Sequence, residues 1–128
     1  VGVQPVTIEL ELSGHRRIVN SAGGALYAGW FGGDRGFLEP DVGQYDEPLH
    51  MEVCFRFPMP KSRRAAVRSL GIASKTTAPD LDKLIRSTGD ALTTSGLIRD
   101  DALICSVHAS KLEVVGWSGA VIRLVPVP

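Results

Sequence analysis

The sequence predicts an α+β fold in which one main helix packs on a small mixed or antiparallel sheet. Two predicted strands precede this helix and two follow it, an order that is typical of the class. The chain has 128 residues, which is enough for one domain with its own hydrophobic core. We therefore expect residues 1–128 to form a single domain.

The strands are predicted from the alternation of apolar and polar residues. It is clearest over residues 50–57, where Met51, Val53 and Phe55 alternate with polar or weakly polar side chains, and where prolines follow at once. Proline ends such a strand because it lacks a backbone donor. The other expected strands cover residues 3–12, residues 102–107 with a continuation toward residue 115, and residues 120–127.

Residues 80–95 are the best helix candidate, because apolar side chains recur there at the i, i+3, i+4 spacing of one buried face. Asp80 suits the first turn, where carboxylates are favoured, and Gly96 suits the position just past the last turn. A shorter helix is expected within residues 62–70, ahead of Gly71. The expected buried face of the main helix consists of Leu81, Leu84, Ile85, Thr88, Ala91 and Leu92.

The segment from Gly14 to Pro48 is rich in glycines and turn signals. It predicts a long irregular connection, which could include a hairpin. Cys54 and Cys105 lie in apolar, strand-like runs and are expected to be buried free thiols. No apolar run approaches the ~20 residues that cross a bilayer, and no secretory signal is evident at Val1. We expect a cytoplasmic protein without a membrane partner.

Four carboxylates in two short motifs are the most informative feature for function. Asp80 and Asp82 open the main helix, and Asp100-Asp101 follows its far end. Crowded carboxylates repel one another. A hard divalent cation such as Mg²⁺ relieves this repulsion, because it binds carboxylate oxygens as its ligands. The main helix is expected to be ~24 Å long. Asp101 follows its far end, so the chain has to bring Asp101 back to the start of the helix if it is to form one site with Asp80 and Asp82. Either the chain runs back alongside the helix, or the site is shared between subunits.

Basic residues surround these motifs and favour a phosphodiester as the substrate. The chain has no net charge overall, but residues 61–128 hold ten basic residues against six acidic ones. Spacing by four residues places Arg86 one helical turn from Asp82, where it could pair with that carboxylate or contact a metal-bound phosphate. The expected DNA-contacting residues are Lys61, Arg63, Arg64, Lys75, Lys83, Arg86 and Lys111.

These motifs resemble the RusA family of Holliday junction resolvases. The similarity rests on Asp80-Leu81-Asp82-Lys83-Leu84-Ile85-Arg86, then Asp90-Ala91-Leu92, Gly96, Asp100-Asp101 and Lys111, and extends to the strand end at residues 55–60. It covers about half of the chain, and residues 1–48 match poorly.

The resemblance implies a homodimeric, Mg²⁺-dependent endonuclease, with Mn²⁺ as a possible substitute, that binds four-way DNA junctions and makes paired symmetric nicks. It places the catalytic and metal-binding aspartates at Asp80, Asp82 and Asp101. Such proteins act in recombination, in repair or in phage DNA processing, in a bacterial cell or a phage-infected host. In that setting, Trp30, Phe31 and Phe37 are expected to pack in the core or at the dimer interface rather than to enter the junction.

Two departures from the family pattern leave alternatives open. Lys83 replaces the family's asparagine and Arg86 replaces its functional lysine; arginine keeps the charge but does not readily release a proton. One alternative is therefore a junction-binding protein with impaired catalysis. The others are a metal-dependent phosphoesterase acting on another nucleic acid and a structural protein in which the aspartates only cap and turn.

Overall fold

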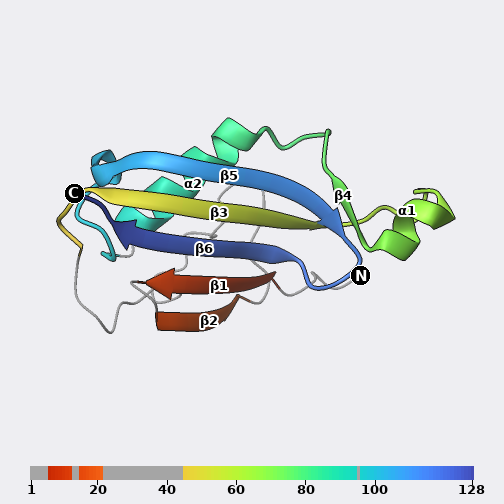
Figure 1. Cartoon of the computed structure of the whole chain (residues 1–128), viewed down its shortest axis with the longest axis horizontal. Coiled ribbons are helices and arrows are strands. Elements are labelled where there is room, and N and C mark those ends of the chain that lie inside the picture. The colour runs from red at the N-terminus through yellow and green to blue at the C-terminus, as the bar shows by residue number, and fades with distance from the viewer. Residues whose placement is uncertain (1–5, 13–14, 22–44, 95) are drawn as a thin grey trace.

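The computed structural model describes residues 6–12, 15–21, 45–94 and 96–128, and it shows a six-stranded sheet (Figure 1). The order of strands across the sheet is β2-β1-β6-β3-β5-β4. Together with two α-helices, this confirms the α+β class. The strands are β1 (Val6–Leu12), β2 (His15–Ser21), β3 (Leu49–Pro58), β4 (Ile72–Ser74), β5 (Ile104–Val114) and β6 (Gly119–Pro126).

The sheet is mixed, as expected. Strand β3 pairs in parallel with β5 and antiparallel with β6, and β1 pairs in parallel with β6. The hairpin of β1 with β2 and the short pairing of β4 with β5 are antiparallel. Strand β3 therefore lies near the middle of the sheet. Its buried and partly exposed residues alternate because successive side chains point to opposite faces, and α2 covers only one of them.

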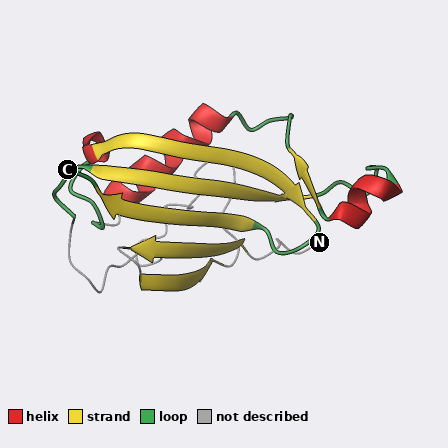
Figure 2. Cartoon of the chain, viewed as in Figure 1, coloured by secondary structure: helices red, strands yellow, loops and turns green. Residues whose placement is uncertain are grey.

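One face of the sheet is covered by α2 (Leu81–Thr94), which lies behind β5 and β3 in the view of Figure 2. From the sheet, Met51, Phe55 and Ile122 are fully buried in the core beneath this helix. From the helix, the buried residues are Leu84, Thr88, Gly89 and Leu92. Three of these four belong to the predicted face, and Leu81, Ile85 and Ala91 pack against the same core.

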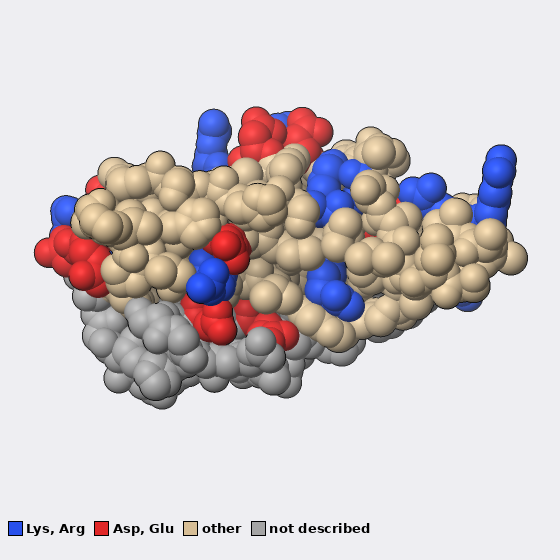
Figure 3. Space-filling view, viewed as in Figure 1, with Lys and Arg blue, Asp and Glu red and all other residues tan. Residues whose placement is uncertain are grey.

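The other face of β3 carries polar side chains and an open hollow of about 310 Å³. Arg123 on β6 lies between Glu11 on β1 and Glu52 on β3, with its Nε 2.8 Å from Glu11 Oε2 and its Nη1 3.2 Å from Glu52 Oε2. Figure 3 shows a basic side chain with acidic side chains beside it in the middle of this face. Glu9 also lines the hollow, so carboxylates outnumber the cation among its described lining residues.

The chain between β3 and α2 forms a small basic unit at one end of the sheet. Helix α1 (Ala65–Leu70) ends at Gly71, whose φ of 78° is left-handed and suits glycine at this position. Arg63 forms an ion pair with Glu113, and its Nε donates to Oε1 of that carboxylate at 2.7 Å. Because Glu113 is only 3% exposed, Arg63 compensates a buried charge.

After α2, the chain turns back under the helix. Gly96 has a φ of 82°, and Leu97 and Ile98 are fully buried. The backbone of Tyr45 accepts from Arg99 N–H at 2.9 Å and donates to Leu97 O at 2.8 Å. This pairing fixes the direction in which the chain approaches Asp100 and Asp101.

Several sequence expectations need correction. Strand β2 makes a hairpin with β1 at the start of the segment expected to be largely irregular, for which a hairpin was left open, and β4 was not predicted. Cys105 is exposed rather than buried, because it lies on the part of β5 beyond its pairing with β4. Cys54 is half-buried. Trp30, Phe31 and Phe37 lie outside the described residues, as does the rest of 22–44.

The ends of the predicted elements are largely confirmed. The helices begin and end within three residues of the expected positions, and β3, β5 and β6 cover the expected segments. The strand expected from residue 102 begins two residues later, because residues Asp101–Leu103 form a short 3₁₀ turn, η1. None of the helices described is long and apolar enough to cross a membrane.

Candidate active site

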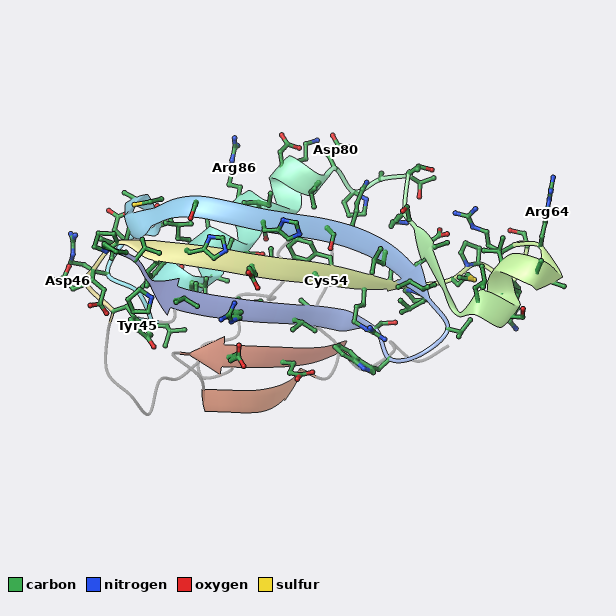
Figure 4. All side chains as sticks on the ribbon, in the orientation of Figure 1. Tyr45, Asp46, Cys54, Arg64, Asp80 and Arg86 are labelled. Atoms are coloured by element: carbon green, nitrogen blue, oxygen red, sulfur yellow. The ribbon has the colours of Figure 1, made fainter. Side chains whose placement is uncertain are left out.

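Asp80 and Asp82 lie at the start of α2 and are exposed. Figure 4 shows Asp80 pointing away from the sheet. The start of the helix is held by Lys111 on β5, whose Nζ donates to the carbonyl oxygens of Thr77 and Pro79 at 2.7 and 2.8 Å. Lys111 thus anchors the residues leading into α2, and both carboxylates project from a fixed helix end.

Asp100 and Asp101 occupy the turn that precedes β5. Asp100 has extended backbone geometry, and its carboxylate Oδ1 accepts from the N–H of Ala102 at 2.9 Å. This contact caps η1 and leaves the carboxyl group of Asp101 beside that of Asp100. Both side chains are exposed, so an ion and its water ligands could reach them.

Asp101 packs against the middle of α2 at Gly89. A methyl group placed on Gly89 would lie 3.2 Å from Cβ of Asp101 and 3.6 Å from its Oδ2. A glycine inside a helix costs about 1 kcal/mol relative to alanine. Here its missing side chain lets the Asp100–Asp101 turn approach the helix backbone.

The charges at this contact are crowded. A hydrogen bond shared with the carboxyl of Asp100 raises the pKa of Asp101 above its ordinary value, and the charges of Asp100 and Asp90 raise it further. Conversely, the hydrogen bond from Ala102 N–H, followed by that from Asp101, lowers the pKa of Asp100. The pair therefore holds a proton more readily on Asp101, as expected where like charges meet.

Arg86 lies on the exposed side of α2, between the carboxylates at the start of the helix and those near Asp101. Asp82, Arg86 and Asp90 are spaced by four residues, and all three are exposed. Arg86 thus lies one turn from Asp82 and one turn from Asp90, which neighbours Asp101. Its side chain projects away from the sheet in Figure 4.

The described part of one chain brings Asp101 close to Asp90 but not to Asp80 and Asp82. The seven-residue interval from Asp82 to Gly89 corresponds to ~10 Å along the helix axis. Within the described residues, no three His, Cys, Asp or Glu side chains are arranged to hold a metal ion. The Asp100–Asp101 pair nevertheless fits Mg²⁺ in its donor chemistry, since Mg²⁺ is often bound by one or two carboxylates together with water and phosphate oxygens.

The structure divides the expected DNA-contacting residues into two groups. Arg63 and Lys111 make internal contacts, and Lys75 Nζ donates to Thr77 Oγ1 and lies 4.9 Å from the ring centroid of Phe57. Lys83 lies 3.9 Å from Asp80 Oδ2, an exposed pair that contributes little. Lys61, Arg64 and Arg86 are exposed, and Arg64 projects from the far end of the molecule in Figure 4.

Crowded carboxylates on an α+β domain, beside a basic surface, are typical of nucleases that cleave phosphodiesters. The chain matches the family model described as Endodeoxyribonuclease RusA over residues 38–124. This protein therefore belongs to the RusA family, whose members are endodeoxyribonucleases acting on branched DNA. In comparisons with curated proteins and with solved structures, no match was found.

Sequence reasoning did not identify Gly89 as part of the site. The signal was present, because a glycine within a strongly periodic helix indicates a packing or functional requirement. What it approaches could not be inferred, since the approach depends on how Leu97 and Ile98 are buried beyond the helix.

We predict that Gly89→Ala reduces DNA cleavage far more than it reduces stability. Alanine favours the helix by up to about 1 kcal/mol, which offsets the crowding of its methyl group at 3.2 Å from Asp101. The displaced Asp101 would no longer hold its position in the site. Cleavage rates and melting temperatures of the variant and of the control Thr94→Ala, an exposed position of the same helix, test this. Unchanged cleavage by Gly89→Ala would show that the contact is not needed.

The raised pKa of Asp101 predicts a pH-dependent gain in stability for Asp101→Asn without metal. The interactions that raise the folded pKa of Asp101 contribute fully to stability at pH values below 3.8, the ordinary pKa of this carboxyl group in the unfolded chain. This contribution is lost as the pH rises through the higher folded pKa. The melting temperature of the variant, relative to wild type, should therefore rise over that window and stay higher at neutral pH.

Adding Mg²⁺ at neutral pH should reverse this order, because a bound cation stabilises the folded wild type. A variant that is no more stable than wild type at any pH would contradict the crowding of Asp101. An equal response of both proteins to Mg²⁺ would place the ion elsewhere.

Proposed function

We propose that this protein is a Mg²⁺-dependent endodeoxyribonuclease that resolves four-way DNA junctions by paired symmetric nicks, with Mn²⁺ as a possible substitute. It would act as a homodimer in the cytoplasm of a bacterial cell or a phage-infected host, in recombination, repair or phage DNA processing. The observation that carries the proposal is the docking of the Asp100–Asp101 pair at Gly89, beside Asp90 and one helical turn from Arg86. Family membership supports the nuclease activity.

In this proposal, Asp80, Asp82 and Asp101 hold the metal ion. The ion would polarise the scissile phosphate and lower the pKa of a bound water. Arg86 lies between the two carboxylate groups, where its guanidinium can bind phosphate oxygens in a bidentate manner. Because arginine does not readily give up a proton, its role is to neutralise charge rather than to protonate the leaving group.

A homodimer could complete the site that one chain leaves divided. The exposed stripe of α2 is symmetric about Arg86, with an aspartate four residues to either side. If two copies of α2 pair antiparallel around an axis near Arg86, the stripe residue Asp82 faces Asp90 of the partner subunit. The Asp101 next to that Asp90 would then approach Asp80 and Asp82 across the interface. Two such sites match two strands to be cut.

The basic end of the molecule supports a polyanionic substrate. Residues 53–79 contain six basic residues and no acidic one, and Figure 3 shows basic side chains spread toward α1. Exposed Lys61 and Arg64 can contact the DNA backbone, as can Lys83 and Arg86 near the aspartates. Such contacts make binding salt-dependent, whereas the internal contacts of Arg63, Lys75 and Lys111 make these three residues weaker candidates.

The test is a nicking assay on a synthetic four-way junction with Mg²⁺. We expect wild type to make paired symmetric nicks, and Asp82→Asn and Asp101→Asn each to reduce the rate at least 100-fold, since each removes a metal ligand. A mixture of the two variants, refolded together, should recover part of the activity, because half of the sites in a mixed dimer keep every aspartate.

The controls separate the alternatives. A mixture that stays inactive, although mixed dimers form, would place all ligands of a site within one chain. Tight junction binding by wild type without cleavage in Mg²⁺ or Mn²⁺ would indicate a binding protein impaired by Lys83 and Arg86. Equal cleavage of linear duplex would indicate a phosphoesterase without specificity for junctions.

A further inference from the structure

Four apolar side chains are exposed together at the basic end of the molecule. Leu70, Ile72, Val115 and Trp117 are 75%, 49%, 53% and 38% exposed, and they are four of the five large exposed apolar residues in the described part of the chain. Val115 N–H donates to Gly71 O at 3.2 Å, which joins α1, β4 and the turn between β5 and β6. We call these four residues the apolar tip.

Trp117 is held in place by Arg56 of β3. The guanidinium carbon lies 4.0 Å from the centroid of the Trp117 ring, and Arg56 Nε donates to Trp117 O at 3.0 Å. A methyl group on Gly116 would come within 3.2 Å of Arg56 Nη2, so the arginine lies tightly along this turn. Contacts at both the ring and the backbone fix the orientation of the indole.

The surroundings of the apolar tip are strongly positive. The adjoining residues 53–79 carry six cations and no acid, and residues 114–122 carry no charge. The one nearby acid on β5, Glu113, is buried and paired with Arg63. Among the described residues, Arg56 has no carboxylate partner within ion-pair distance, so its charge stays available to a ligand.

We propose that Trp117, backed by Arg56, is a stacking site for an unpaired or terminal base of branched DNA. An apolar surface alone would not attract a polyanion, but the basic residues around the apolar tip do. The combination suits a ligand that has both phosphates and exposed flat bases. Aromatic rings bind bases by stacking, and arginine adds a cation–π contribution. Base pairs at the exchange point of an opened junction lack a neighbour on one side and present such a face.

This site is separate from the aspartates of α2 and rests on the proposed function only for the choice of branched DNA. Its contribution is recognition of the junction centre rather than hydrolysis. The preorganised ring suits this role, because a base can stack on it without first ordering a mobile side chain.

The test measures binding to a four-way junction that carries 2-aminopurine either at the exchange point or within an arm, in EDTA to prevent cleavage. Wild type should quench the fluorescence at the exchange point and leave the arm position unchanged. Trp117→Leu, which keeps an apolar side chain, should lose the quenching and bind about 5- to 100-fold more weakly. Trp117→Phe should restore part of both effects.

The salt dependence of binding provides the matched control. Trp117→Leu should leave the slope of log affinity against log salt unchanged, whereas Arg64→Gln should make it shallower by about one and keep the quenching. Melting temperatures of all variants check that each is folded. Should Trp117→Leu misfold, Arg56→Gln provides the second variant and should weaken quenching in the same direction.

Three outcomes would overturn the inference. A folded Trp117→Leu protein that quenches and binds like wild type would show that no base stacks there. A variant that becomes monomeric in sedimentation would show that the apolar tip is a subunit interface. A wild type with no preference for the junction over linear duplex would overturn the proposed function, and this inference with it.

Discussion

The close approach of Asp101 to the backbone of α2 at Gly89 is the contact on which the rest of the site depends. It requires a helix residue without a side chain, a left-handed turn at Gly96 and a buried return through Leu97 and Ile98. As a result, a hydrogen bond shared with Asp100, together with the charges of Asp100 and Asp90, raises the pKa of Asp101. Folding alone would not favour this arrangement, which supports the proposal that a cation binds there.

Basic residues gather at the end of the molecule around α1, and we propose that this end attracts a polyanion. On the face away from α2, Arg123 lies among Glu9, Glu11 and Glu52 in the described part of the chain. On the α2 side, Lys83 and Arg86 also lie among carboxylates, so the excess of basic residues is at the end around α1. DNA bound along this side would meet both the aspartates and the apolar tip defined above.

Much of the fold could be predicted from periodic patterns. Strand β3 and helix α2 have regular alternation and a regular apolar stripe, so their faces were identified correctly from sequence. Strand β4 has only three residues, of which Ile72 is exposed; its extended form depends on pairing with β5 rather than on its own pattern. Cys105 was expected to be buried because its sequence neighbours are apolar. The sequence does not reveal that β4 pairs with only the far end of β5, which leaves the edge of β5 near Cys105 uncovered.

The site could be predicted only as a list of residue types. Asp80, Asp82 and Asp101 were proposed from their crowding in sequence and from the family resemblance. Their distances depend on tertiary contacts, above all the Tyr45 pairing with residues 97–99. The roles of Arg63 and Lys111 also could not be inferred, because a basic side chain that compensates Glu113 or holds two carbonyls has the same sequence signal as one that binds DNA.

In the proposed site, the cation binds where Asp101 meets α2, together with Asp80 and Asp82. The most direct measurement is to add Mn²⁺ in small steps to ¹⁵N-labelled protein and to record which backbone amide signals the paramagnetic ion broadens first. We predict early broadening at residues 80–82, Gly89, Asp90 and residues 100–102. Early broadening at Glu9, Glu11 and Glu52 instead would place the ion on the opposite face and contradict the proposal.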